Sequence, residues 1–208
     1  MTMNPKATPM LLLALTVLTT AALANGNMLT NGDAEAGNLS GWTHTGAIAS
    51  TGITETMGHV SPHEGNWFFS IHTNSGGGGS MSQNGTTGLS SNQLVLNGMV
   101  QTEDLHYGDG IGEYAKIFLT IFDDQNSPLV QEISPIIRTL NLQWVPFELI
   151  AAVPQDADHW QVDLTGTMQE GSYVNVFYDA VSLTPEPATL ILAAAGLPFL
   201  LKRKHGRQ

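Results

Sequence analysis

The chain has 208 residues, of which 18 are acidic and seven are Lys or Arg, and its formal net charge is −11. A surface this acidic repels nucleic acid and anionic lipid, which makes DNA and RNA poor partners. The chain has no cysteine, so a disulfide framework is also excluded, and the fold must rest on a hydrophobic core, for which the chain is long enough.

The first 24 residues have the layout of a secretory signal peptide. Lys6 provides a basic flank, residues 10–23 are apolar, and Ala22-Leu23-Ala24 has the small residues of a cleavage site. A buried N-terminal helix is the alternative interpretation. We expect cleavage after Ala24 and export of the mature chain through the inner membrane.

Residues 25–184 form one predicted domain with the pattern of short β-strands. Gly, Ser, Thr, Asn and Asp interrupt the sequence about every ten residues, and no long stretch has the apolar period of a helix. Many short strands around one core indicate a β-sandwich. The glycine run Ser75–Ser80 is predicted to be a flexible loop. Strands are predicted at residues 67–72, 93–101, 114–123, 130–137, 144–152, 159–164 and 173–183.

Charge is distributed unevenly over the chain. Residues 25–184 contain 17 of the 18 acids but only two of the seven cations, Lys116 and Arg138, which leaves −15 before histidines are counted. Such a domain favours solubility and the binding of cations.

The last predicted strand carries an acid among apolar residues. Alternation places Phe177, Asp179, Val181 and Leu183 on one face, which should be the core face because three of the four are apolar. A carboxylate that points the same way needs a partner, since an unpaired buried charge is costly. Because few cationic side chains are available, a bound metal ion is the favoured partner. The alternative is that Asp179 lies at the wet end of the strand.

Motifs at both ends of the domain carry a family resemblance. Met28–Gly37 reads MLTNGDAEAG, Gly41-Trp42 follows it, and Val176–Leu183 reads VFYDAVSL near the end of the domain. Together with His63–Trp67, these motifs resemble the galactose-binding-like jelly-roll domains, which include several families of carbohydrate-binding modules. The resemblance implies an all-β fold, a single jelly-roll β-sandwich.

The same resemblance implies that particular residues have structural roles. In the family resembled, the Glu of the opening motif and the Asp of the closing motif bind a structural calcium ion, together with main-chain carbonyls of the turn. Carried over to this sequence, the calcium ligands are Glu35 and Asp179, with Asp33 and carbonyls of residues 64–66 as secondary candidates. Trp42 and Trp144 match core positions. Two departures from the family pattern are Ala34, which replaces Phe, and Ala180, which replaces a second Asp.

Catalytic motifs are missing from the sequence. His63-Glu64 begins like the zinc motif H-E-x-x-H, but residue 67 is Trp, and there is neither a G-x-S-x-G elbow nor a cysteine nucleophile. The acids of residues 103–113 could form a glycosidase pair, although a solvated acidic loop is the preferred interpretation. We therefore expect that this protein is not an enzyme.

A loop between two predicted strands is the candidate ligand site. In His106–Gly110, the ring of Tyr107 can stack on a pyranose while His106 and Asp109 bond its hydroxyl groups, although Tyr107 can also be a simple packing residue. We expect an exported, non-catalytic protein that binds extracellular polysaccharide or belongs to an exopolysaccharide or biofilm matrix. The alternatives are a structural surface protein without a small ligand, or a glycoside or ester hydrolase.

The C-terminal 24 residues form a separate signal. Pro185-Glu186-Pro187 is followed by the uncharged residues 188–201 and by Lys202-Arg203-Lys204. A helix over residues 188–201 reaches about 21 Å, short of roughly 30 Å of hydrocarbon, and its basic end stays cytoplasmic. The three parts in this order resemble a PEP-CTERM sorting signal, the substrate of an exosortase. The resemblance implies transient insertion of a transmembrane helix, followed by removal of the tail and surface display. A buried globular helix is the alternative.

Overall fold

The structure is a computed structural model that describes residues 26–46, 48–52, 60–73, 77–103, 113–139, 143–168 and 174–186. These residues form ten β-strands, and no membrane-crossing helix was found among them. The predicted signal peptide, the sorting tail from Pro187 onward and the candidate loop His106–Gly110 lie outside the described residues.

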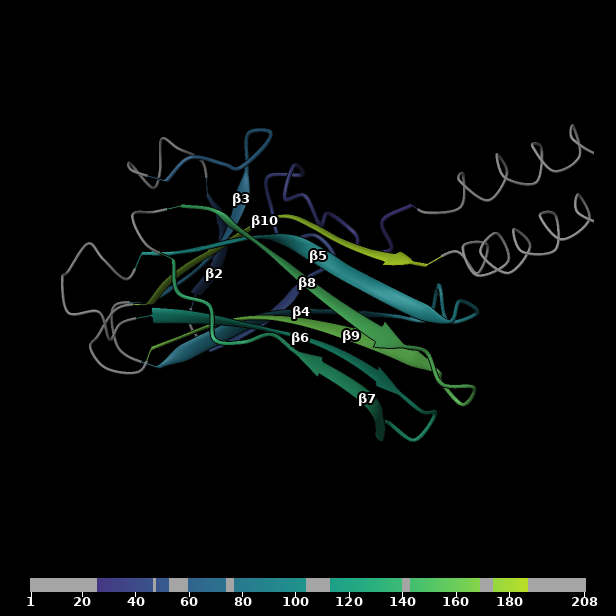
Figure 1. The fold of residues 1–208 in the computed structure, drawn as a ribbon. Helices are drawn as coiled ribbons and strands as arrows, with labels where there is room; N and C mark the ends of the chain where they lie inside the picture. The colour runs from purple at the N-terminus through teal and green to yellow at the C-terminus, as the bar shows by residue number, and fades with distance from the viewer. Residues whose placement is uncertain are drawn as a thin grey trace, which may run out of the picture.

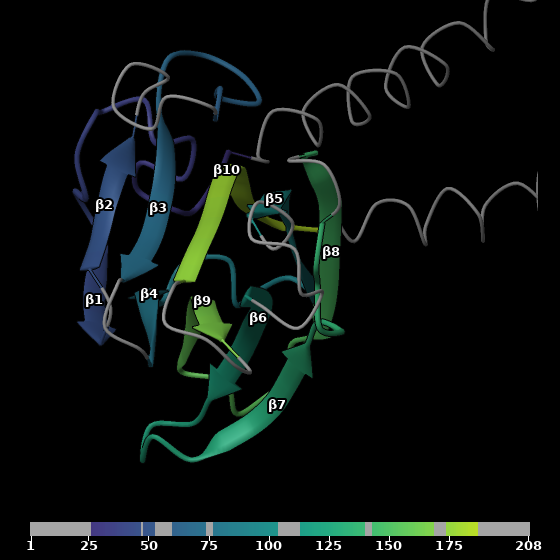
Figure 2. The ribbon, with the colours of Figure 1, turned by 90° about the vertical axis from the view of Figure 1, so that its left-hand side faces the viewer.

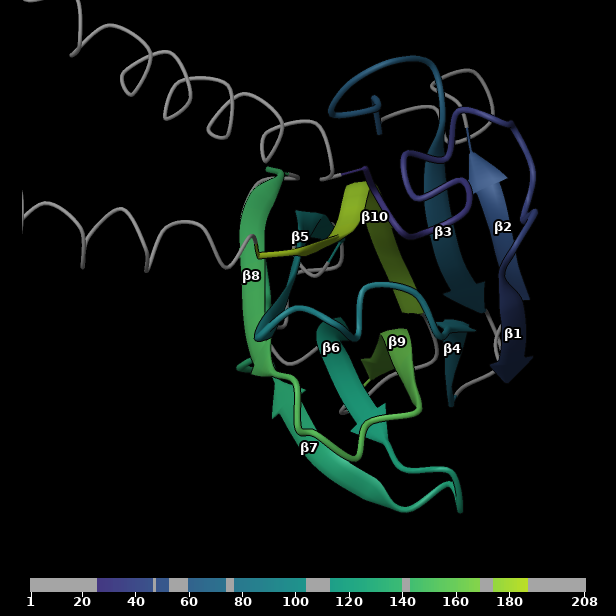
Figure 3. The same ribbon diagram turned by 90° about the vertical axis from the view of Figure 1, so that its right-hand side faces the viewer.

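The strands form two antiparallel sheets that stack as two layers (Figure 1). The order in sheet A is β1 (Thr43–Gly46), β4 (Gly78–Gly85), β9 (His159–Met168), β6 (Glu113–Phe122) and β7 (Pro128–Ile133). The order in sheet B is β2 (Ile48–Gly52), β3 (Phe68–Thr73), β10 (Val174–Pro185), β5 (Gln93–Thr102) and β8 (Val145–Ala152). Figures 2 and 3 show the layers from opposite sides, with β7 and β8 at the same edge.

The chain crosses repeatedly between the two sheets. The four-strand rows β3-β10-β5-β8 and β4-β9-β6-β7 face each other, and this is the connectivity of a jelly roll. The prediction of an all-β fold with a single jelly-roll sandwich is therefore confirmed.

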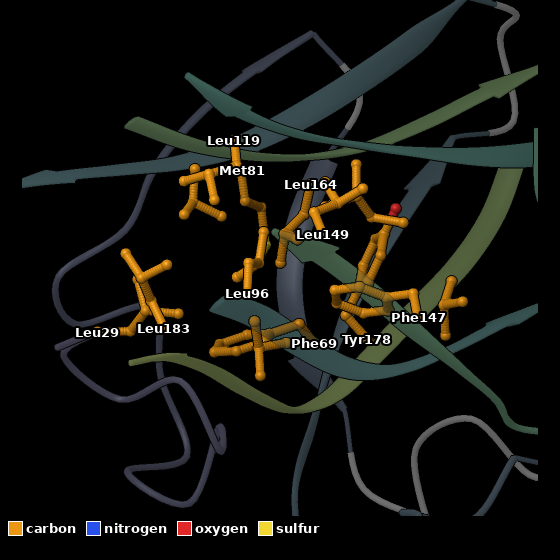
Figure 4. Packing of buried hydrophobic residues seen from close by; sticks show 14 of the residues in the cluster. Leu29, Phe69, Met81, Leu96, Leu119, Phe147, Leu149, Leu164, Tyr178 and Leu183 are labelled. Carbon is orange, nitrogen blue, oxygen red and sulfur yellow. The ribbon is translucent and has the colours of Figure 1, made fainter. Parts of the chain in front are cut away.

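The hydrophobic core lies between the sheets and takes alternate residues from each strand. In β6, Ala115, Ile117, Leu119 and Ile121 are fully buried, whereas the residues between them are mostly less buried. Burying each large apolar side chain contributes roughly 1.5–3 kcal/mol, which explains how a chain without cysteine holds this fold. Side chains of both sheets meet in Figure 4, among them Phe69, Met81, Leu96, Leu119, Phe147, Leu149, Leu164 and Tyr178.

The opening segment lies alongside the last strand. Met28 N donates to Leu183 O at 2.8 Å, and Val181 N donates to Gly32 O at 3.0 Å. The side chain of Asn27 extends this contact, because its amide donates to Val181 O and its oxygen accepts from Leu183 N, each at 2.9 Å. The two ends of the domain are thus adjacent, as the calcium prediction requires.

Three of the strands, β1, β2 and β4, were not predicted from the sequence. The predicted loop Ser75–Ser80 is wrong in its second half, because Gly78–Ser80 form the start of β4. A Cβ on Gly78 would lie 2.7 Å from the carbonyl oxygen of Gly166 in the neighbouring strand. At Gly78, therefore, glycine allows two strands to approach closely.

The two tryptophans predicted to be core residues differ in their positions. Trp42 belongs to the main core and is 6% exposed, which confirms the prediction. Trp144 instead covers a second, small cluster of Val60, Phe68 and Phe177. It remains half-buried, and its Nε1 donates to Ser61 O at 2.9 Å. Trp144 is therefore not a residue of the main core, as predicted, but one that anchors the segment before β3.

Candidate functional site

The alternation predicted for the last strand breaks after Asp179. Phe177 packs in the small outer cluster, whereas Val181 and Leu183 face the main core. A β-bulge directly after Asp179, in which Ala180 has a φ of 51°, adds a residue and reverses the alternation. The prediction that these four residues share one face is therefore wrong.

Asp179 is fully buried, and backbone N–H groups satisfy its carboxylate. Oδ2 accepts from His63 N at 2.7 Å and from Glu64 N at 3.2 Å, and Oδ1 accepts from Ala180 N at 2.7 Å. Burial raises the pKa of Asp179 above its ordinary value, although the three hydrogen bonds oppose this shift. Asp179 therefore fixes the turn of residues 63–67 to β10.

Glu35 holds the other end of the same turn. Its Oε1 accepts from Asn66 N at 2.8 Å and from Trp67 N at 2.9 Å. The bond from Trp67 is the main cause that lowers the pKa of Glu35. Gly65 has a φ of 64°, and a Cβ there would collide with the Glu35 carboxylate, so the turn requires glycine. Asp33, which is exposed, accepts from Glu35 N at 3.3 Å and so stabilises the opening segment.

The predicted calcium site has few possible ligands among the described residues. In the part of the chain that the structure describes, no group of three or more acids and histidines is placed to hold a metal ion. The turn of residues 63–67 directs backbone N–H groups at Glu35 and Asp179. The family resemblance had implied that carbonyl oxygens of this turn would bind the calcium ion. Lone pairs remain on Glu35 Oε2 and Asp179 Oδ1, so two carboxylates could bind an ion, and such a short ligand set fits a weak site. Calcium binding stays a prediction.

The outer face of sheet A is a second candidate site, and it combines aromatic and polar side chains. Because successive residues of a strand point to opposite sides, the residues that alternate with the core residues face outward. This outer face consists of Tyr114, Lys116, Phe118, Thr120 and Phe122 on β6, His159, Gln161, Asp163, Thr165 and Thr167 on β9, and Ser80, Ser82 and Asn84 on β4.

Hydrogen bonds and a ring contact order several side chains of this face. Gln161 Nε2 donates to both carboxylate oxygens of Asp163, each at 2.9 Å. Burial raises the pKa of Asp163, and the Gln161 bond partly offsets that effect. At one end of the face, the Arg138 guanidinium lies 5.5 Å from the ring centre of Tyr114, a cation–π distance. The outer face of sheet A thus carries both ordered polar groups, on Gln161 and Asp163, and the ring of Tyr114, which Arg138 holds in place.

A small polar pocket adjoins this face near Asn84. Its volume is about 90 Å³, and its lining residues are Gly41, Thr43, Ser82, Gln83, Asn84 and Gln161. Gln83 clamps the opening segment there, because it accepts from Thr30 N at 2.7 Å and donates to Thr30 O at 3.1 Å. The pocket extends the hydrogen-bonding surface from β9 to the edge of sheet A.

A larger hollow, of about 490 Å³, lies on the outer face of sheet B beside the bulge. Met99, Pro146 and Phe147 line it together with Glu148. Phe147 is only 6% exposed, so the ring surface of this hollow comes mainly from the imidazole of the exposed His63, which also lines it. The outer face of sheet A is therefore the better candidate for binding a ring-shaped polar ligand.

The outer face of sheet A was not predicted from the sequence. The predicted ligand residues, His106, Tyr107 and Asp109, belong to the segment between β5 and β6 that is outside the described residues. A signal was present in residues 114–122, where buried aliphatic residues alternate with three aromatics, a lysine and a threonine. Aromatic residues are common in strands, but three of them on the outward positions of β6 beside polar residues have the composition that a surface for ring-shaped polar ligands uses.

Comparison with solved structures supports the fold. The chain is similar to the enzymatically active domain of bacteriophage CBA120 tailspike protein 4, with a TM-score of 0.59 and 15% identity over 77% of this chain and 21% of that one. It is also similar to TmCBM61, solved in complex with beta-1,4-galactotriose, with a TM-score of 0.56 and 15% identity over 77% of this chain and 99% of that one. A family 16 carbohydrate binding module-2 gives a TM-score of 0.52 and 20% identity over 76% and 99% of the two chains.

These similarities define a jelly-roll β-sandwich of the kind found in carbohydrate-binding modules. The chain spans about a fifth of the tailspike domain's length but nearly all of each of the two modules. No protein-family profile and no curated protein matches the sequence. At these identities the similarity establishes the fold alone.

Proposed function

We propose that residues 25–184 form a non-catalytic carbohydrate-binding domain, with the outer face of sheet A as its glycan-binding surface. The observation that carries this proposal is the row of Tyr114, Phe118 and Phe122 along β6 beside the amide and carboxylate groups of β9. A pyranose has apolar ring faces and a rim of hydroxyl groups, so aromatic rings with polar neighbours suit it. The two modules of similar fold agree with this function.

The predicted loop can extend the same surface. It lies between β5, which ends at Thr102, and β6, which starts at Glu113, and Tyr114 is the next residue. We propose that Tyr107, His106 and Asp109 add ligand contacts to this surface, because their loop precedes Tyr114 closely in the sequence. These three residues remain proposed ligand contacts.

Glycan binding can be tested on the full chain with a panel of soluble polysaccharides. We expect retention on at least one glycan, and Tyr114→Ala and Phe118→Ala should each weaken the affinity about tenfold or more, or about 1.4 kcal/mol, because buried aromatic contacts dominate such interfaces. Ile150→Ala is the matched control, because Ile150 is 43% exposed on sheet B and should not affect binding. Equal losses in all three variants would contradict the proposed surface.

A structural surface protein is the second candidate function. The edge strand β7 and the residues after it expose Leu129, Ile133 and Ile136, at 38%, 47% and 49%, and exposed apolar groups on a sheet edge favour association between chains. Self-association without retention on any glycan of the panel would favour this function over carbohydrate binding.

The export and sorting predictions complete the proposal. We propose that the chain is exported by its signal peptide, cleaved after Ala24, and sorted to the cell surface through the Pro185-Glu186-Pro187 tail by an exosortase-like enzyme. The support is the sequence order of the signals; β10 itself continues to Pro185, and Glu186 N donates to Gln93 O at 3.0 Å. Mass spectrometry of the surface protein should find residues 202–208 removed, and recovery of the intact tail would contradict sorting by cleavage.

A further inference from the structure

The cations of the domain are concentrated on one face. Lys116 and Arg138 are the only Lys or Arg residues in the sequence of residues 25–184, which carries 17 acids. Lys116 points outward from β6 between Tyr114 and Phe118. The antiparallel bridge between Ala115 and Ile137 places Arg138 opposite Tyr114, where it stacks on the ring. Both cations therefore lie on the proposed glycan-binding surface.

The ammonium group of Lys116 has no ion-pair partner among the described residues. The acid nearest to it in the sheet is Asp163, which pairs with Phe118 and so lies diagonally across from Lys116. Both oxygens of Asp163 accept from Gln161 Nε2, and Gln161 lies on the far side of Asp163 from Lys116 along β9. The hydrogen-bond partner of the Asp163 carboxylate is therefore Gln161 and not Lys116.

Two further acids are near Tyr114 in the strand order, Glu113 before it on β6 and Glu103 just after β5 of sheet B, and both are buried. Glu103 and Glu113 are each 5% exposed, so neither presents an open carboxylate to a ligand. Lys116 is therefore the ammonium group that this part of the face offers to a ligand, although the domain as a whole is strongly acidic.

We propose that the glycan bound by this surface carries an anionic substituent, a carboxylate or a sulfate ester on the pyranose ring, and that Lys116 binds it. This inference rests on the proposed function. An ammonium group gains most from an anionic partner, because charge-assisted hydrogen bonds are about twice as strong as neutral ones. The acids elsewhere repel such a glycan and so favour its binding in one place and one orientation.

The test compares glycans that differ only in charge, on the full chain. The probes are polygalacturonate, the same polymer fully methyl-esterified, a neutral galactan and its sulfated form. We expect the wild type to bind a charged polymer about tenfold tighter than its neutral counterpart. K116Q should abolish this preference, and K116R should keep it. If the preference is larger within the polygalacturonate pair, the substituent is a carboxylate. If it is larger within the galactan pair, the substituent is a sulfate ester.

The outcomes separate this inference from the proposed function. Binding of the neutral polymers with equal affinity, or a charge preference that survives in K116Q, would overturn the role of Lys116 and leave the glycan-binding surface intact. Failure to bind any of the four polymers would contradict both. A thermal melt of K116Q confirms that the variant is folded before its affinity is interpreted.

Discussion

Asp179→Ala is expected to lower the free energy of unfolding by about 2–4 kcal/mol, because it leaves three backbone N–H groups without their acceptor. Asp179 is fully buried and accepts from His63, Glu64 and Ala180. For a domain of this size the loss corresponds to a fall in Tm of roughly 5–15 °C. Chemical denaturation and a thermal melt measure it directly.

Asp163→Ala is the matched control for this experiment. Asp163 is half-buried on sheet A and accepts from one side chain, that of Gln161, so the control should cost under about 1 kcal/mol. A loss at Asp179 no larger than the loss at Asp163 would show that the turn does not depend on the buried carboxylate.

The pH dependence gives a second readout for Asp179. Burial raises its pKa in the folded state, so the fold favours the protonated carboxyl. The stability that Asp179 contributes is therefore complete below the ordinary pKa of Asp, about 3.9, and decreases as the pH rises through the raised value. The difference in unfolding free energy between wild type and Asp179→Ala should be larger at about pH 4 than at about pH 7.

Calcium is expected to raise the stability of the full chain through Glu35 and Asp179. An ion that binds only the folded state adds about 2.7 kcal/mol at a hundred times its Kd, which is a Tm increase of several degrees. Both carboxylates contact the turn of residues 63–67, so an ion between them would tie the opening segment to β10. A chelator should reverse the increase.

Glu35→Gln is the variant that tests this ion. Glu35 is exposed, so the substitution should leave the fold intact and abolish most of the calcium-dependent shift, because the amide removes the negative charge that attracts the ion. Magnesium and sodium at matched ionic strength control for screening of the acidic surface. A calcium shift equal to theirs, or one retained in Glu35→Gln, would exclude the predicted site.

The two carboxylates of the family motifs, Glu35 and Asp179, were predictable from the sequence in part only. The opening and closing motifs predicted Glu35 and Asp179 as calcium ligands, which stays a prediction. In the structure both side chains contact the turn of residues 63–67. The sequence could not show that the turn offers N–H groups, because the direction of a main-chain group depends on φ and ψ values such as that of Gly65.

The sequence by itself determined the fold class and most of the strands of this protein. Strands such as β5, β6 and β9 were predictable because alternating apolar residues have to be buried on one side of a sheet. The strands that were missed, β1, β2 and β4, are short or rich in Gly, Ser and Thr, and they form because neighbouring strands supply the hydrogen bonds.

Only the tertiary structure decided which outward residues share a surface. Tyr114, Lys116 and Phe118 belong to one strand, but the register of β6 with β9 sets Asp163 opposite Phe118, and a bridge in the segment after β7 sets Arg138 opposite Tyr114. The bulge after Asp179 likewise moves that residue away from the main core. Register and bulges depend on how strands distant in the sequence pair, and alternation within one strand carries no information about its neighbours.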